Sequence, residues 1–168
     1  VLIKGENDHE IIDFINFTQE NMVSVRFIEF MPFDGNQWDE SRTVKTKHIL
    51  TEIKQEFGEQ LVKLKDPKNS TSVNYQINGY LGSFGFISTV SNPFCDSCNR
   101  IRLTADGKIK NCLFGADETD LLTALRNNQD ITSLIQESIQ SKHKSLGGIQ
   151  NFSDPDEHQN RMMTTIGG

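Results

Sequence analysis

The three cysteines of this chain are spaced so that they could share one metal centre. Cys95 and Cys98 lie three residues apart, and Cys112 follows after a predicted turn. Two cysteines at this spacing on a tight turn can reach one metal or cluster, while the third must return from elsewhere in the fold. An odd number of cysteines in an acidic chain does not fit the disulfide framework of a small secreted protein. The spacing therefore predicts a metal site.

The cysteines alone leave three kinds of site open. A structural zinc centre normally has four ligands, so a histidine from outside the segment would have to complete it. A redox pair would need neither Cys112 nor the neighbouring arginines. A four-iron cluster held by three thiolates leaves one iron open to a substrate atom. The spacing favours the cluster, then zinc, then the redox pair. The histidines, none of which lies in a recognisable motif, are His9, His48, His143 and His158.

Residues 104–108 (TADGK) predict how Cys112 returns to the cysteine pair. They are typical of a three-residue hairpin loop with Gly107 in the left-handed conformation. If Thr104 pairs with Lys108, Cys112 falls opposite Arg100. Because strand side chains alternate, Cys98, Arg100 and Arg102 would share that face. A two-residue Asp-Gly turn would instead put Cys112 on the other face.

Arginines near the cysteines indicate an anionic ligand. Arg100 and Arg102 would suit a polyphosphate, because guanidinium groups bind phosphate oxygens in pairs; the alternative is a pair of solvated strand arginines. Arg26 lies within an apolar predicted strand, where an unpartnered charge is costly. Pairing with Glu29 is the alternative, but residues three apart on a strand face opposite ways. We therefore predict that Arg26 points into a barrel interior.

The hydrophobic pattern predicts the elements that position these residues. Residues 1–3 and 23–30 indicate strands, with a helix between them that begins at an Asp8 cap, so the first part is one βαβ unit. Residues 31–36 form a loop at the carboxyl end of the second strand, where active sites form in such folds. A further helix runs from Thr46 and ends at Gly58. Short strands then follow at residues 61–64, 73–77 and 84–90, and helices at 118–127 and 131–143. The change of pattern predicts a boundary between regions 1–58 and 59–168.

Composition excludes some classes of protein. The chain has 168 residues, 35% of them hydrophobic and 24% charged, which is typical of a globular domain with a core. A net charge of −6 argues against a general binder of nucleic acid or of membrane surfaces. No apolar run approaches the roughly 20 residues of a membrane span. We therefore expect neither nucleic-acid nor membrane partners, and a cytoplasmic location.

Four segments in combination resemble a known family. They are residues 25–32 (VRFIEFMP), 94–107 (FCDSCNRIRLTADG), 112–114 (CLF) and 166–168 (IGG). Together they are similar to the GTP 3′,8-cyclases, the MoaA family of radical S-adenosylmethionine enzymes in molybdenum cofactor biosynthesis. The resemblance runs from the first strand to the last residue. Each segment alone would be a weak signal.

The resemblance implies a fold, a reaction and cofactors. The fold is α/β: the C-terminal part of an incomplete (β/α) radical S-adenosylmethionine barrel, followed by a cysteine-bearing β-hairpin region and C-terminal helices. An N-terminal [4Fe-4S] cluster on a CxxxCxxC motif cleaves S-adenosylmethionine to the 5′-deoxyadenosyl radical. That radical abstracts a hydrogen from the ribose of GTP, and C8 of the base then bonds to the ribose. A second, C-terminal [4Fe-4S] cluster with an open iron binds GTP.

The resemblance also implies roles for single residues. Cys95, Cys98 and Cys112 would hold the second cluster, and Met31 would contact S-adenosylmethionine. The GTP-binding residues would be Arg26, Arg100 and Arg102. The tail that reaches into the active site would end in Gly167 and Gly168. Fixing both ends of the nucleotide in this way is catalysis by positioning.

The chain departs from the family pattern in one respect. It contains no CxxxCxxC motif, and residues 1–3 lack an initiator Met and read as a strand already under way. We therefore expect a piece of a longer protein, inactive alone. In the full protein, cyclic pyranopterin monophosphate synthase would act on the product. A homodimer, a mitochondrial location in a eukaryote and a radical enzyme with another substrate stay open, and residues 144–160 have no assigned role.

Overall fold

The computed structural model describes residues 1–154 and 160–166, and the chain divides into two compact units. The first unit is Val1–Met31 with Asp39–Phe94, and the second is Pro32–Trp38 with Cys95–Gly168. Both contain helices and strands, which confirms the mixed α/β class, while the incomplete barrel stays a prediction. No helix of the described residues is long and apolar enough to cross a membrane.

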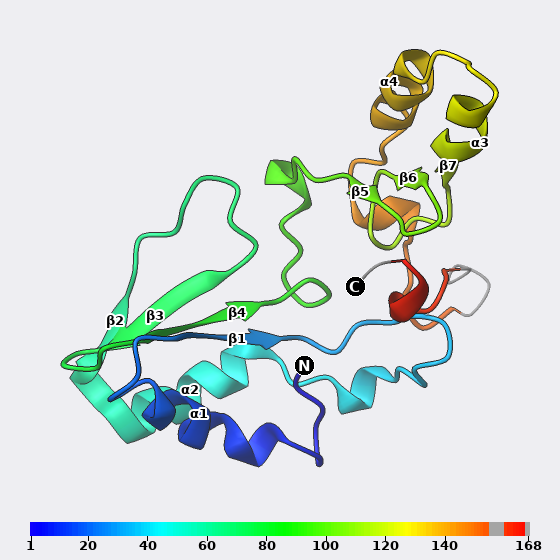
Figure 1. Ribbon diagram of the computed structural model, residues 1–168. Coiled ribbons are helices and arrows are strands. Elements are labelled where there is room, and N and C mark those ends of the chain that lie inside the picture. Colours follow the sequence, from blue (N-terminus) through cyan, green and yellow to red (C-terminus); the bar gives the residue numbers. More distant parts are fainter. Residues whose placement is uncertain (155–159, 167–168) are drawn as a thin grey trace. The chain divides into compact units, whose positions relative to one another are not determined.

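A four-stranded sheet in the order β1-β4-β3-β2 is the centre of the first unit (Figure 1). The strands are β1 (Ser24–Ile28), β2 (Leu61–Lys63), β3 (Val73–Ile77) and β4 (Ser83–Ile87). β1 and β4 pair in parallel, and the other neighbours pair antiparallel. The predicted first strand is reduced to a parallel bridge between Leu2 and Glu29 and an antiparallel one between Ile3 and Thr43.

Two helices bury the apolar face of this sheet. They are α1 (Ile11–Phe17), which continues the 3-10 turn η1 (Asp8–Glu10), and α2 (Thr46–Phe57). Ile15 of α1, Ile53 of α2 and Phe84 of β4 are completely buried in one core cluster. Asp8 is not the predicted cap: its carboxylate accepts a hydrogen bond from the Gly5 N–H at 2.8 Å. α2 ends at Gly58, as predicted, because this residue takes a φ of 52° that favours glycine.

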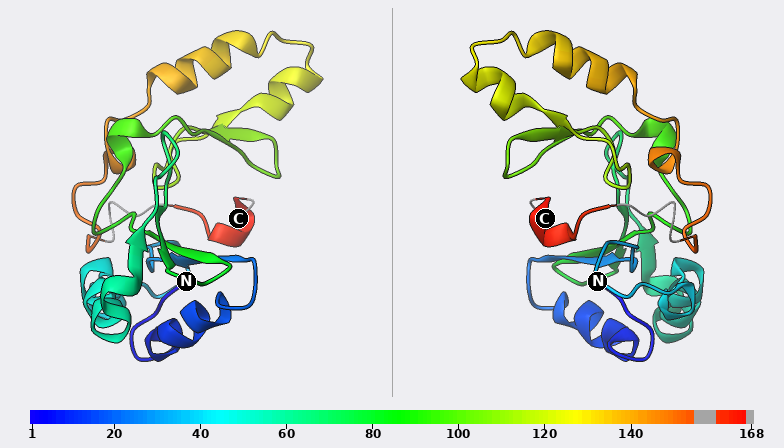
Figure 2. Two further views of the ribbon diagram at one scale, coloured as in Figure 1. Left: turned by 90° about the vertical axis from the view of Figure 1, so that its left-hand side faces the viewer. Right: turned by 90° about the vertical axis from the view of Figure 1, so that its right-hand side faces the viewer.

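The second unit is built on a smaller antiparallel sheet in the order β5-β6-β7. Its elements are β5 (Arg102–Leu103), β6 (Lys108–Lys110), β7 (Thr119–Asp120), α3 (Leu121–Arg126) and α4 (Thr132–Gln140). The remaining 3-10 turns are η2 (Glu40–Arg42) and η3 (Gly58–Gln60) in the first unit, and η4 (Cys95–Ser97), η5 (Leu146–Gly148) and η7 (Met163–Thr165) in the second. Figure 2 shows α3 and α4 on one side of these strands, and both helices contact β6.

The loop after β1 belongs to the second unit rather than to the sheet that it leaves. Phe33 stacks on Phe114, with ring centroids 5.9 Å apart. A Cβ placed on Gly35 would lie 3.3 Å from the Met162 sulfur, so the C-terminal segment packs on the same loop. Residues 59–94 lie in the first unit because β4 pairs with β1. The predicted division of the chain into regions 1–58 and 59–168 stays a prediction.

Glu29 holds the chain that leaves β4. Its side chain is 3% exposed, and its Oε2 atom accepts the N–H groups of Val90 at 2.7 Å and Ser91 at 2.9 Å. A carboxylate that accepts two backbone donors fixes a turn more firmly than a neutral acceptor does. Glu29 therefore holds the chain at residues 90 and 91, within the first unit.

We predict that Glu29→Ala loosens this turn, because two part-buried N–H groups lose their acceptor. The loss is expected to be about 1–3 kcal/mol. Hydrogen exchange of residues 88–94 in the full-length protein should become at least about fivefold faster. Glu29→Gln keeps an acceptor and should change it less, and the exposed Glu20→Ala is the control. Unchanged exchange in Glu29→Ala would contradict the assignment.

Candidate functional site

The cysteine pair lies on a tight turn, as predicted. Cys95 begins the 3-10 turn η4, and the Cys98 N–H donates to the Cys95 carbonyl at 3.0 Å. Both thiols are free and half-buried, and each sulfur accepts a hydrogen bond. Cys95 Sγ lies 3.4 Å from the Leu146 N–H nitrogen, and Cys98 Sγ lies 3.5 Å from Lys142 Nζ. Donors aimed at sulfur are typical of iron–sulfur sites.

The hairpin has the predicted three-residue loop. Thr104 N–H donates to the Lys108 carbonyl at 2.8 Å, and Arg102 pairs with Lys110. Gly107 has a φ of 78°, and a Cβ there would lie 2.4 Å from that of Leu122. A side chain at this position would therefore be strained twice, by the backbone conformation and by close contact. The loop residue and the pairing both agree with the sequence-based hairpin.

Cys112 lies two residues beyond the end of β6, so the predicted pairing of Cys112 with Arg100 is not part of the sheet. Its thiol is half-buried and lies in the same unit as the other two. Within the residues described, no three His, Cys, Asp or Glu side chains are gathered closely enough to hold a metal ion. The donor set still fits a cluster, because it consists of three free thiols with N–H donors at two of them.

The surroundings of Cys98 favour its thiolate. Partial burial acts to raise the pKa of this thiol, but the backbone N–H of Arg100 and the positive charge of Lys142 outweigh it. The pKa of Cys98 is therefore lowered from its ordinary value. Thiolates, not thiols, bind metals, so this environment suits a ligand.

The two predicted phosphate-binding arginines lie in the same unit as the cysteines. Arg100 is exposed and Arg102 is half-buried. Arg102 lies directly opposite Lys110, and like charges at such a pair destabilise a sheet unless they are compensated. Lys110 is 1% exposed, donates to the Gly115 carbonyl, and lies 3.7 Å from Glu118. Burial lowers the pKa of Lys110, and Glu118 acts against this.

The other predicted ligand residues lie in the first unit. Arg26 is exposed, not buried, and donates to the Ser24 hydroxyl. Arg26 lies on the sheet face opposite to the one that α1 and α2 cover, and the barrel interior that we expect on this face stays a prediction. Arg26 does not pair with Glu29, whose carboxylate binds Val90 and Ser91. Met31 is half-buried at the end of this unit. Gly167 and Gly168 lie outside the described residues.

The C-terminal segment is bound to the hairpin by charged and polar groups that the sequence did not predict. The Arg161 guanidinium donates two hydrogen bonds to the Asp106 carboxylate, at 3.1 and 3.2 Å, which together form a fork. Its Nε atom lies 3.0 Å from Glu118 Oε1. Asn160 donates to the carbonyl of Leu113, next to Cys112, at 2.8 Å. The Thr104 hydroxyl, followed by Arg161, holds the pKa of Asp106 well below its usual range. The stability from this carboxylate is present at neutral pH and is lost as pH falls below about 4.

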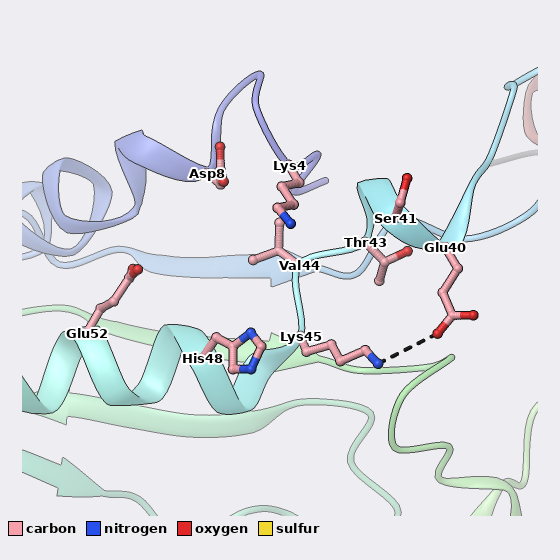
Figure 3. Close-up of a pocket in the computed structure, with 9 residues that line it drawn as sticks. All are labelled: Lys4, Asp8, Glu40, Ser41, Thr43, Val44, Lys45, His48 and Glu52. Atoms are coloured by element: carbon pink, nitrogen blue, oxygen red, sulfur yellow. Dashed lines mark ion pairs between the residues drawn. The ribbon is translucent and has the colours of Figure 1, made fainter.

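A pocket of about 520 Å³ lies elsewhere, in the first unit (Figure 3). Its lining mixes both charges: Lys45 faces Glu40 at 3.6 Å, and Lys4, His48 and Glu52 lie around it. None of the predicted ligand residues lines this pocket.

The chain is an α/β protein whose second unit carries three free thiols together with Arg100 and Arg102. Over residues 23–147 the chain matches the model of the family described as Molybdenum Cofactor Synthesis C. Since this match covers more than half of the chain, the protein belongs to that family.

Named relatives align with almost the whole chain. It is 39% identical over 170 residues to the GTP 3′,8-cyclase of Alkaliphilus oremlandii, covering 100% of this chain and 51% of the relative. It is 36% identical over 171 residues to the mitochondrial GTP 3′,8-cyclase of Arabidopsis thaliana, covering 100% and 43%. Human molybdenum cofactor biosynthesis protein 1 is 37% identical over 169 residues, covering 99% and 26%. The chain thus spans about a quarter to a half of these relatives.

We predict that Arg161 and Asp106 stabilise the hairpin as one unit. Arg161→Ala and Asp106→Asn should each speed hydrogen exchange of residues 104–110 in the full-length protein, because each removes the same fork. The double variant should speed exchange by less than the two single effects combined, since the fork is lost only once while Arg161 also pairs with Glu118 and Asp106 with Lys108. Arg126→Ala, on the exposed side of α3, is the control. Additive effects would contradict the pairing.

Proposed function

We propose that this chain is the C-terminal part of a GTP 3′,8-cyclase of molybdenum cofactor biosynthesis. In the full protein, S-adenosylmethionine and an N-terminal [4Fe-4S] cluster outside this chain would generate the radical. The reaction would convert GTP to (8S)-3′,8-cyclo-7,8-dihydroguanosine 5′-triphosphate. This chain would supply the substrate side of the active site and would be inactive alone.

The observation that carries the proposal is the composition of the second unit. Free Cys95, Cys98 and Cys112 share it with Arg100 and Arg102. The family match covers all five positions, and relatives named GTP 3′,8-cyclase align along the whole chain. A zinc-stabilised module would need neither arginine, so these residues favour a site that binds an anionic substrate.

We propose that the three thiolates hold a [4Fe-4S] cluster. When bound, such a cluster offers one iron with an open coordination position, since three thiolates serve four irons. Lys142 and the Leu146 N–H would neutralise part of the negative charge on the sulfurs. The cluster itself would draw the three sulfurs together, because metal binding and local folding are coupled.

The arginines would hold the triphosphate. Arg100 and Arg102 carry permanent charge and a planar fork of donors, which suits phosphate oxygens better than an ammonium does. Arg26 would contact GTP from the first unit, and Met31 would contact S-adenosylmethionine. Gly167 and Gly168 would complete the site. Holding both ends of GTP would keep one ribose C–H bond in reach of the radical.

Three further features of the full protein belong to this proposal. The product would pass to cyclic pyranopterin monophosphate synthase. Two copies could form a homodimer. The location would be cytoplasmic, or mitochondrial if the source is a eukaryote, as the name of the Arabidopsis relative states for that protein.

We predict that Cys112→Ser removes one cluster from the full-length enzyme. Iron should fall from about eight to about four atoms per chain after anaerobic reconstitution, because one of two four-iron clusters is lost. GTP-dependent product should disappear. Asp117→Ala, an exposed change in the same loop, is the control and should keep both. About one zinc per chain and unchanged iron in Cys112→Ser would contradict the cluster and support the zinc site.

We also predict that Arg100→Ala and Arg102→Ala weaken GTP binding without loss of iron. Each change removes charge-assisted hydrogen bonds worth about 1.5–3 kcal/mol, so the Kd should rise about 10- to 100-fold. Equilibrium dialysis of the reconstituted full-length protein measures this, with Arg126→Ala as the control. An unchanged Kd in both variants would exclude a role in phosphate binding.

A further inference from the structure

The segment from Lys142 to Gly148 contacts the cysteine region at several points. Lys142 Nζ lies 3.5 Å from Cys98 Sγ and 2.7 Å from the carbonyl oxygen of Arg100. The Leu146 N–H nitrogen lies 3.4 Å from Cys95 Sγ. One short segment therefore supplies a charged donor to one thiol and a neutral donor to another. These contacts did not follow from the sequence, because the segment lies far from the cysteines along the chain.

The backbone of this segment has an uncommon conformation that allows these contacts. Leu146, Gly147 and Gly148 have φ values of 48°, 67° and 90°, all in the left-handed region. Leu146 in this region is uncommon for a residue with a branched side chain. A Cβ on Gly147 would lie 2.4 Å from the Gly115 nitrogen, so only glycine fits against the loop after Cys112. This turn thus lies against that loop while its amide faces Cys95.

Lys142 comes two residues after the end of α4, which Asn111 holds against the hairpin. The Asn111 side-chain amide donates to the Ser138 carbonyl at 2.7 Å and to the Ser141 hydroxyl at 3.3 Å. Asn111 is 6% exposed and adjoins Cys112. Among the ion pairs of the described residues, none includes Lys142, so its half-buried charge is directed at the sulfur and the carbonyl. The helix end and the hairpin are therefore held together next to Cys112.

We propose that Lys142 and the Leu146 amide are positioning groups that set the reduction potential of the cluster held by the three cysteines. This inference rests on the proposed function. A positive charge and N–H donors at the sulfurs stabilise the reduced cluster, because it carries one more negative charge than the oxidised form. Lys142 also fixes the Arg100 backbone, so it couples the sulfur environment to the arginine that would bind phosphate.

The test measures the midpoint potentials of the reconstituted full-length enzyme by EPR-monitored redox titration. Wild type should show two cluster potentials and about eight irons per chain. Lys142→Met should lower one of the two potentials and leave the other unchanged, and Lys142→Gln, which keeps a donor, should lower it less. Lys144→Met removes the same charge two residues away, at an exposed position, and should change neither.

The variant Gly147→Ala tests the role of the Leu146 N–H group. The added methyl group would conflict with Gly115 and displace the Leu146 N–H, so the same potential should fall. Gly5→Ala is the matched control, because Gly5 has a φ of 80° but no neighbouring atom within 4 Å of a Cβ. Its potentials should equal those of wild type.

The outcomes separate this inference from the proposed function. Unchanged potentials in Lys142→Met and Gly147→Ala, with full iron content, would overturn the inference and leave the proposed function intact. A single potential and about four irons in wild type would instead overturn the proposed function. Loss of about four irons in both neutral Lys142 variants, but not in Lys144→Met, would overturn the inference in favour of a role for Lys142 in retaining the cluster.

Discussion

The register of the β5–β6 hairpin decides which side chains of the cysteine segment lie together. Arg102 pairs with Lys110 around a loop that needs Gly107 in a left-handed conformation. A slip of one residue would move every side chain of one strand to the opposite face. The site on the second unit depends on this pairing, since it sets where the chain leaves β6 toward Cys112. Glu118 and Arg161 stabilise it by ion pairs with the hairpin, and Asn111 connects it to the end of α4.

Charge compensation follows from this register. The hairpin places Arg102 opposite the buried Lys110, and Glu118 lies within 3.7 Å of Lys110. The ion pair with Glu118 offsets the charge of Lys110, which leaves the guanidinium of the half-buried Arg102 as the charge of this pair nearer to solvent. In the first unit, Glu29 fixes the chain that leads into the cysteine turn.

Local patterns predicted much of this structure. The strands of the first sheet, α2 with its glycine end and the three-residue hairpin loop follow from period, turn residues and β-branched content. Contacts between distant residues did not follow, because no local pattern encodes them: Lys142 with Cys98 and Arg161 with Asp106 are examples. The exposure of Arg26 did not follow from the apolar residues around it, because exposure depends on what covers a sheet face, and its place in a barrel interior stays a prediction. The three thiols are not gathered to hold a metal within the described residues, so the cluster stays a proposal.

Our proposal is that Cys95, Cys98 and Cys112 would hold a four-iron cluster that binds the nucleotide. Mössbauer spectra of the ⁵⁷Fe-reconstituted full-length protein, recorded with and without GTP, test it most directly. Comparison with Cys112→Ser identifies the signals of this cluster. We expect about four irons assigned to the three cysteines, with the signal of one of them changed by GTP. Spectra that GTP leaves unchanged, or zinc in place of these irons, would contradict it.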